Sequence, residues 1–276
     1  ADYSKSKSFI ENLGQFDEFE TNSTGKIEYA VDFGSTRILF GKKGISYNFL
    51  EARKIPRAER ERIMNSPVSS IADHKSKEKL VGKFMFKQDA VNMTWLNPST
   101  STQLITSEET SDYHNYSVKN SAGEYVSVSN AKAYKKLTYK NIYSNIDIEY
   151  VVHPEIGIKY AIIVHPGANP SDVAMVFDRD ISLLDGKIDI PTEFGSIIDH
   201  APLTFYQGDN SNIIPSSFKQ EQNTIRFSVG NYDNTQTLII DPWTQTPAFN
   251  TNWDVVWEVE KDGAGNVYIL GGIMPM

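Results

Sequence analysis

The stretch from 27 to 49 shows a strict alternation of hydrophobic and polar positions. Apolar side chains recur at every second position in three short runs that are separated by glycine-containing turns. A period of two is typical of a strand with one buried face. A register with Val31 opposite Ile38 and Tyr29 opposite Phe40 gathers the apolar side chains of the first two runs on one face, and the third run aligns likewise. The pattern predicts a three-stranded antiparallel meander.

A second alternating block runs through 146–152 and 158–164, on either side of a turn at 153–157. It predicts a hairpin with one apolar face. Shorter runs predict further strands at 80–86, 91–96, 173–177, 181–184, 187–190, 203–206, 224–229 and 237–240. Turn residues separate these runs at intervals of roughly 8–12 residues, which favours an all-β fold. We therefore expect one or more antiparallel β-sandwich-like domains.

The region from 53 to 65 has a different pattern, because charged and helix-favouring residues replace the alternation. Pro56 suits the first turn of a helix, and Pro67 would end it. We expect a short surface helix here. The segments 66–78 and 97–111 are rich in Ser, Thr or Lys, and we expect both to be exposed loops.

The domain organisation follows from where the alternation stops. We expect an all-β domain over 1–242, either as one unit or as two sub-sandwiches divided near 111–133. We expect 243–276 to be a linker followed by one hairpin. A lone hairpin is marginal in water, so we expect the natural chain to continue. The start Ala1-Asp2-Tyr3 suits either removal of an export signal or an engineered beginning.

Composition excludes several classes of protein. Of the 276 residues, 39% are hydrophobic and 22% are charged, which is enough apolar material for a core and excludes a disordered tail. A net charge of −8 argues against a broad surface for nucleic acid. The sequence has no apolar run long enough for a membrane-spanning helix. Cysteine is absent, which excludes disulfides, thiolate metal sites and a cysteine nucleophile.

The histidines and the paired acids are the main candidates for chemistry. The five histidines show no short metal-binding spacing, and His153 and His165 flank opposite ends of one predicted hairpin. Two acid pairs could share a strand face and serve general acid–base catalysis, namely Asp147 with Glu149 and Asp178 with Asp180. Charge of this kind more often solubilises a strand, and Lys159 across the hairpin would balance Glu149. We interpret all of these residues as structural.

Two further features have a binding alternative. The glycine-rich segment Asp262–Asn266 lacks the spacing and the terminal glutamate of an EF-hand, so we expect a turn. The four tryptophans could form a sugar platform, although packing is the commoner role; they are Trp95, Trp243, Trp253 and Trp257. We expect no catalytic, cofactor-binding or metal-binding residue and no cofactor, and we assign no ligand-binding residue.

Several segments, in this order and spacing, resemble a bacterial domain of unknown function that precedes SBBP-type β-propeller repeats. They are Phe9–Phe16, Gly44–Phe49, Tyr139–Tyr150, His165–Pro170, Ala201–Gln207, Leu238–Pro242 and Asp262–Gly271. The resemblance covers about 9–272, and its last segment is similar to the opening of a propeller repeat. The region from 51 to 111 departs from the family's pattern, so the resemblance assigns no partner surface to it.

The resemblance implies an exported protein of the cell surface or the medium. Such proteins are frequent in Bacteroidota, and some carry gliding-motility or type IX secretion domains. We expect a non-enzymatic module for adhesion, motility or contact with other envelope proteins, with surface polysaccharide as a further partner. One alternative is a secreted carbohydrate-binding or carbohydrate-active protein. The other is an accessory subunit of an outer-membrane secretion or adhesion complex.

Overall fold

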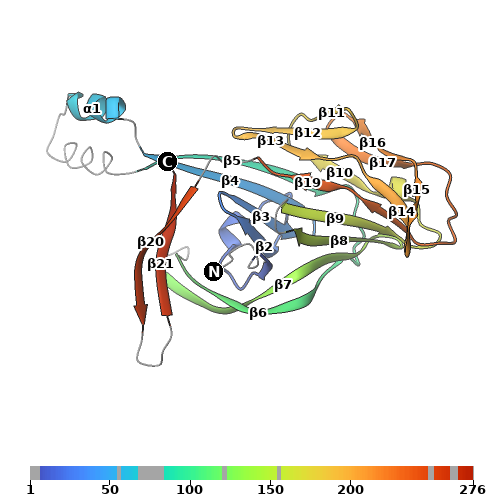
Figure 1. Cartoon of the computed structure of the whole chain (residues 1–276), viewed down its shortest axis with the longest axis horizontal. Coiled ribbons are helices and arrows are strands. Elements are labelled where there is room, and N and C mark those ends of the chain that lie inside the picture. The colour runs from blue at the N-terminus through green and yellow to red at the C-terminus, as the bar shows by residue number, and fades with distance from the viewer. Residues whose placement is uncertain are drawn as a thin grey trace. The chain divides into compact units, whose positions relative to one another are not determined.

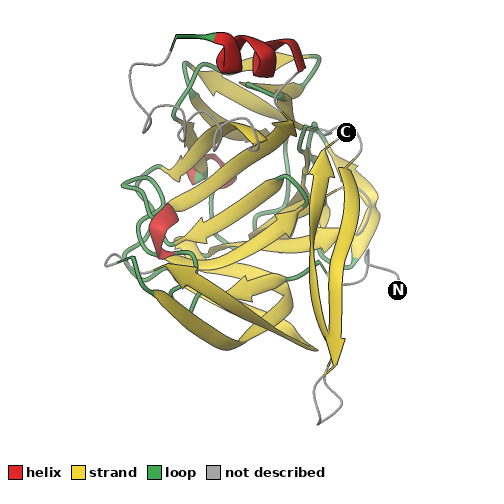
Figure 2. Cartoon of the chain, turned by 90° about the vertical axis from the view of Figure 1, so that its left-hand side faces the viewer, coloured by secondary structure: helices red, strands yellow, loops and turns green. Residues whose placement is uncertain are grey.

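The protein is built almost entirely of antiparallel strands (Figures 1 and 2). The computed structural model describes residues 7–54, 57–67, 84–119, 123–153, 157–247, 252–261 and 267–275. Nineteen of its strands belong to one hydrogen-bonded sheet, and the two others form a separate ladder. The all-β antiparallel fold predicted from the alternation is therefore confirmed.

The strands of the large sheet are β1 (Phe9–Glu11), β2 (Ile27–Phe33), β3 (Thr36–Gly41), β4 (Gly44–Lys54), β5 (Phe84–Trp95), β6 (Gln103–Lys119), β7 (Tyr125–Tyr143), β8 (Ile146–His153), β9 (Gly157–Val164), β10 (Ala174–Phe177), β11 (Ser182–Leu184), β12 (Lys187–Thr192), β13 (Gly195–Asp199), β14 (Leu203–Tyr206), β15 (Asp209–Ile214), β16 (Ser216–Glu221), β17 (Thr224–Val229), β18 (Leu238–Asp241) and β19 (Trp243–Gln245). Short 3₁₀ turns lie at Asp17–Phe19 and Pro170–Asp172.

The chain divides into two compact units. The first comprises 1–48 and 90–248, and it contains both cavities described below. The second comprises 49–89 and 249–276. It includes α1 (Arg57–Asn65), which has no buried residue, so the predicted short surface helix is confirmed.

The pairing of the first two strands of the predicted meander is confirmed. Val31 lies opposite Ile38 and Tyr29 opposite Phe40 in the β2–β3 ladder. The expectation that only one face is apolar was wrong, because Ala30 and Leu39 on the other face are fully buried. That face is covered by a second small core, which strand β1 and the turn after it complete. Its residues are Ile10, Phe16, Ile27, Ala30, Leu39, Ala131 and Ala133.

The predicted β8–β9 hairpin is confirmed. Ile148 lies opposite Ile162, and Tyr150 lies opposite Tyr160. These side chains are buried, as one apolar face requires. The opposite face is not wholly polar and exposed, because Asp147 on that face is only 3% exposed. The hairpin therefore carries a buried carboxylate directly behind the core.

Two strands, β5 and β6, are longer than the sequence predicted. Strand β6 begins at Gln103, so the predicted loop over 97–111 was wrong beyond its first residues. Its ladder with β7 uses backbone groups, which Ser and Thr supply as well as apolar residues do. Two separate strands were predicted at 80–86 and 91–96, but β5 runs without a break from Phe84 to Trp95. Residues 68–83 lie outside the described residues.

The predicted linker after 242 begins with a strand instead. Trp243 and Thr244 of β19 lie opposite Lys159 and Ile158 of β9, and β19 also pairs with β13. Three residues are too few to show an alternation, so no pattern in the sequence could indicate this strand. One of the two alternatives placed a division into sub-sandwiches near 111–133, and the described residues of this segment lie in or beside the paired strands β6 and β7.

An aromatic chain runs through the core of the first unit. Trp95 and Tyr139 meet edge to face at 5.8 Å, and Tyr139 meets Tyr150 at 6.0 Å. Tyr150 then stacks on Tyr160 at 5.5 Å. Such pairs stabilise a core by about 0.5–1.5 kcal/mol each beyond the area that they bury. Trp95 is buried and is therefore a packing residue. Packing, and not a sugar platform, was the commoner role expected for it.

The separate ladder consists of β20 (Asn252–Lys261) and β21 (Val267–Pro275). It confirms the predicted C-terminal hairpin, whose turn Asp262–Asn266 lies outside the described residues. Among the described helices, none has the length and apolar character needed to cross a bilayer.

Candidate functional site

Asp147 on β8 is a buried carboxylate with three donors around it. Lys140 Nζ lies 2.5 Å from one oxygen, and the backbone N–H of Asn141 donates to the other at 2.8 Å. His165 Nε2 lies 2.8 Å from the oxygen that Lys140 contacts. Burial alone would raise the pKa of Asp147, but the donors at Asn141, His165 and Lys140 together outweigh it and lower that pKa. Asp147 is therefore held ionised.

A bulge in β7 makes this cluster possible. The β7–β8 register shifts between Tyr139 and Tyr143, and Asn141 within the bulge has φ 51°. An extra residue in one strand bends it and re-aims its groups. Here it turns the N–H of Asn141 toward the carboxylate.

The predicted partners of this hairpin's acids need correction. Glu149 lies opposite Ala161 and pairs with Lys136 at 3.7 Å, whereas Lys159 lies opposite Val151. Lys159 therefore does not lie directly across from Glu149, since the cross-strand register differs from the one that the sequence suggested. The expectation that His153 and His165 lie at opposite ends of the hairpin is confirmed by the backbone register.

A second buried carboxylate, Asp199 on β13, has a different environment. Tyr160 Oη donates to it at 2.6 Å, and Thr244 Oγ1 donates at 3.3 Å. Burial raises the pKa of Asp199 to about 7, although both hydroxyl donors act to lower it. Sequence reasoning missed this residue, because an Asp at the end of a short apolar run resembles an ordinary turn residue.

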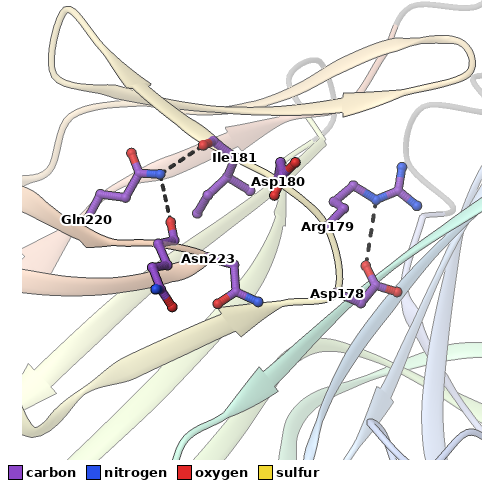
Figure 3. A pocket seen from close by; sticks show the side chains of 7 residues that line it. Asp178, Arg179, Asp180, Ile181, Gln220 and Asn223 are labelled. Carbon is purple, nitrogen blue, oxygen red and sulfur yellow. Dashed lines mark hydrogen bonds and ion pairs between the residues drawn. The ribbon is translucent and has the colours of Figure 1, made fainter.

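The first cavity has a volume of about 650 Å³ and lies between the 178–181 loop and the β16–β17 hairpin (Figure 3). It brings together the predicted acid pair, Asp178 and Asp180. Its lining is Asp178, Arg179, Asp180, Ile181, Gln220, Gln222 and Asn223. We call it the acidic cavity.

Most polar groups of the acidic cavity already have partners within the protein. Gln220 Nε2 donates to the carbonyls of Ile181 and Gln222, both at 2.8 Å (Figure 3). Asn223 Nδ2 donates to the carbonyl of Phe177 at 2.6 Å. Asp178 accepts from Asn92 Nδ2 at 2.7 Å. These bonds fasten the 177–181 loop to its neighbours.

Arg179 serves the same purpose at the edge of the acidic cavity. Its guanidinium donates to the carbonyl of Pro191 at 2.8 Å and to the carbonyl of Ala90, and Nε lies 3.6 Å from Asp178. An arginine bound to two carbonyls braces the backbone. Arg179 is the one cationic residue in the lining, and its guanidinium is therefore already bound to carbonyls of the chain.

A second cavity of about 420 Å³ lies at the β7–β8 turn, beside the Asp147 cluster. We call it the asparagine pocket, because three asparagines contribute to it. Its lining is Asn97, Ser99, Ser101, Asn141, Tyr143, Ser144 and Asn145. The backbone N–H of Ser99 donates to the carbonyl of Ile142 at 2.8 Å and joins its two segments.

The histidines, the acids and the tryptophans were the candidates for metal binding and for a sugar platform. The described residues include no group of three or more His, Asp and Glu placed to hold a metal ion. Trp243 stacks on His200 with ring centroids 3.5 Å apart. The side chains of Trp253 and Trp257, and the segment Asp262–Asn266, lie outside the described residues.

Comparison with known proteins places most of this chain in one family. A family model described as a domain of unknown function, DUF7948, matches residues 9–243. The chain belongs to the DUF7948 family. The DUF7948 match includes Asp147, Asp199 and both cavities, and it ends at the first residue of β19. The comparison with curated proteins gave no match, and the comparison with solved structures gave none.

The family match bears on the resemblance found in the sequence. A domain of unknown function was expected from about residue 9, and this part of the expectation is confirmed. The association with SBBP repeats, with Bacteroidota and with export stays a prediction.

Proposed function

We propose that this chain is a non-enzymatic module of an exported protein and acts at the cell surface by binding other envelope proteins. The resemblance to domains that precede SBBP repeats supports export and surface location. The net charge of −8 supports a protein partner rather than nucleic acid. Adhesion or motility is the process in which such a module would serve.

The observation that carries the proposal is how the buried carboxylates are used. A catalytic acid or base must reach a proton on the bound reactant. Asp147 accepts from three groups of its own chain, and Asp199 accepts from two. Their hydrogen-bonding capacity is directed at the fold. Both residues thus support a rigid platform suited to contact rather than turnover.

The proposal extends to the C-terminal hairpin. We infer that β20 and β21 open a propeller repeat, as the resemblance over Asp262–Gly271 implies. The module would then precede the propeller in the natural chain, in the manner of surface proteins exported by Bacteroidota. A longer native chain that shows further repeats would support this inference, and one that ends near 276 would contradict it.

Co-purification from native membranes tests the proposed function. The chain is tagged and recovered from envelope extracts, and each recovered protein is then tagged in turn. We expect one envelope protein to be recovered in both directions. Recovery in a fixed stoichiometry with a membrane complex would favour the accessory-subunit alternative. Recovery of polysaccharide with no protein would contradict binding to envelope proteins.

Carbohydrate binding is a second candidate function. The observation that favours it is the asparagine pocket, which is lined by amides and hydroxyls and has no formally charged side chain. Groups of this kind fix the orientation of polar ligands in small-molecule sites. This candidate does not require a protein partner.

A further inference from the structure

The side chains of the asparagine pocket are available to a ligand. Asn97, Asn141 and Asn145 are exposed, and within the described part of the chain their side-chain amides make no hydrogen bond. The hydroxyl of Ser144 is likewise without a partner among the described residues. Each amide offers two donors and one acceptor oxygen. The pocket therefore presents several unused donors and acceptors within one small volume.

The backbone at these three asparagines is unusual. Asn97, Asn141 and Asn145 have φ values of 52°, 51° and 56°, which is the left-handed region. Few residues other than glycine adopt it, and Asn tolerates it best. Glycine would fit these positions with less strain. Asparagine adds an amide group that glycine lacks, at the same backbone geometry and around one cavity.

The walls of the pocket are held in place independently of any ligand. The backbone N–H of His165 donates to the carbonyl of Asn145 at 3.0 Å, and Thr102 Oγ1 donates to the carbonyl of Ser99 at 2.6 Å. Asp147 fixes the N–H of Asn141. A site that is ordered before binding loses less conformational entropy when a ligand arrives. The pocket is preorganised in this sense.

The acidic cavity is larger, but it lacks this combination of unused amides and preorganised walls. The amides of Gln220 and Asn223 already donate to carbonyls of the chain, and Arg179 does the same. A ligand there would have to compete with these bonds. All three amides of the asparagine pocket are unused among the described residues, whereas two of the three amides of the acidic cavity are committed, and this difference, not volume, distinguishes the two cavities.

We propose that the asparagine pocket binds a neutral monosaccharide or disaccharide, which deepens the second candidate function. Sugar hydroxyls both donate and accept, as the amides of the pocket do. No lining residue carries a formal charge, and the net charge of −8 disfavours an anionic sugar. A volume of about 420 Å³ lies toward the lower end of the range for small-molecule sites, which suits a short saccharide.

The decisive variant is Asn97→Gly combined with Asn145→Gly. Glycine accepts the left-handed backbone, so the substitution removes the amides and keeps the turn. Asn130→Gly is the matched control, because Asn130 also has a positive φ of 62° and does not line the pocket. Thermal unfolding of all three proteins checks that the fold is retained.

The probes are glucose, galactose, mannose, N-acetylglucosamine, lactose and cellobiose, with glucuronic acid as the anionic comparison. We expect at least one neutral sugar to shift the side-chain amide signals of the pocket asparagines in the native protein's NMR spectrum. We expect its affinity to fall roughly tenfold or more in the double variant and to be unchanged in Asn130→Gly. Tighter binding of a disaccharide than of its monosaccharide would assign a polysaccharide chain as the source, and equal binding would assign a free sugar.

Three results would overturn the proposal. They are a native protein that binds none of the neutral sugars at millimolar concentration, a double variant that binds as the native protein does, and stronger binding of glucuronic acid than of glucose. None of these depends on a protein partner. The double variant should also recover the same envelope protein as the native chain, so failure here is distinguishable from failure of the proposed surface function.

Discussion

Two buried aspartates in the same unit have opposite electrostatic environments. Asp147 is 3% exposed and Asp199 is 5% exposed, but Asp147 contacts the part-exposed Lys140, whereas Asp199 contacts the buried Tyr160. Asp147 is surrounded by an ammonium group, an imidazole and a backbone N–H. Asp199 has two neutral hydroxyls. The pKa of Asp147 lies below its ordinary value, and that of Asp199 is raised to about 7.

The difference shows that the charge of a buried carboxylate depends both on the donors around it and on how deeply the group lies. Desolvation opposes ionisation in both cases. At Asp147 the donors outweigh it, and the ionised carboxylate fixes the bulge beside the asparagine pocket. At Asp199 they do not, and the carboxyl remains largely neutral within the core at mildly acid pH.

Neutralising Asp199 should give the largest effect. Its unfolded pKa is 3.8 and its folded pKa is about 7, so the native protein loses stability as the pH rises between these values. The shift of about 3 units corresponds to a loss on the order of 4 kcal/mol. Asp199→Asn should remove this loss. Urea unfolding between about pH 4 and about pH 8 measures the difference, with the exposed Asp185→Asn as the control.

The difference between native protein and Asp199→Asn should therefore grow in favour of the variant as the pH rises. A difference that is constant over this range would contradict a raised pKa at Asp199. Asp185→Asn should follow the native curve.

Asp147→Asn should have the next largest effect on stability. It leaves Lys140 and His165 without their carboxylate, and we expect a loss of about 2 kcal/mol near neutral pH, below the usual cost for a fully buried pair because Lys140 is 44% exposed. A lowered pKa gives stability that is present above 3.8 and is lost as the pH falls through the folded pKa. The loss should therefore shrink in strong acid. Unfolding curves at neutral and acid pH provide the test, and an equal loss at both would argue against an ionised Asp147.

Tyr160→Phe should have a smaller effect and should sharpen the comparison. It removes one of the two hydroxyl donors of Asp199, and we expect a destabilisation of about 1–2 kcal/mol. The donor lowers the pKa of Asp199, so its loss should raise that pKa further. The pH at which stability levels off should move upward in the same urea series. Movement downward would show that the hydroxyl does not stabilise the charged form.

Glu149→Gln should have the smallest effect. Glu149 is on the same strand as Asp147, but its side chain is 32% exposed and 3.7 Å from Lys136. Surface pairs of this kind are worth about 0–1 kcal/mol. The change in unfolding free energy should therefore stay below about 1 kcal/mol. A loss as large as that of Asp147→Asn would mean that the position of these residues on strand β8, and not burial with strong donors, accounts for both losses of stability.

The same contrast explains what the sequence could predict. The register of β2–β3 and the existence of the β8–β9 hairpin followed from alternation, because a slip of one residue in β2–β3 would expose an apolar face. Strand β15 is mostly exposed and polar, so it left no such pattern. Strand β1 has only three residues. Strand β15 pairs with its neighbour β14 across a short turn, whereas the partners of β1 include the distant strand β7.

The candidate site was less predictable than the fold. Asn97 and Asn141 come together where Ser99 bonds to Ile142 and Tyr143 bonds to the carbonyl of Leu96, contacts that no local pattern encodes. Asp178 and Asp180 were found because they are close in the chain. Asp199 was missed because its burial depends on Tyr160 and Thr244, which belong to two other strands.

The most direct test is an NMR titration of the two carboxyl groups, with the side-chain carbon shifts of Asp147 and Asp199 followed from acid to mildly alkaline pH. We predict that Asp147 titrates below 3.8 and that Asp199 titrates near 7. Titration of both groups together near 3.8, or of Asp199 before Asp147, would contradict the account.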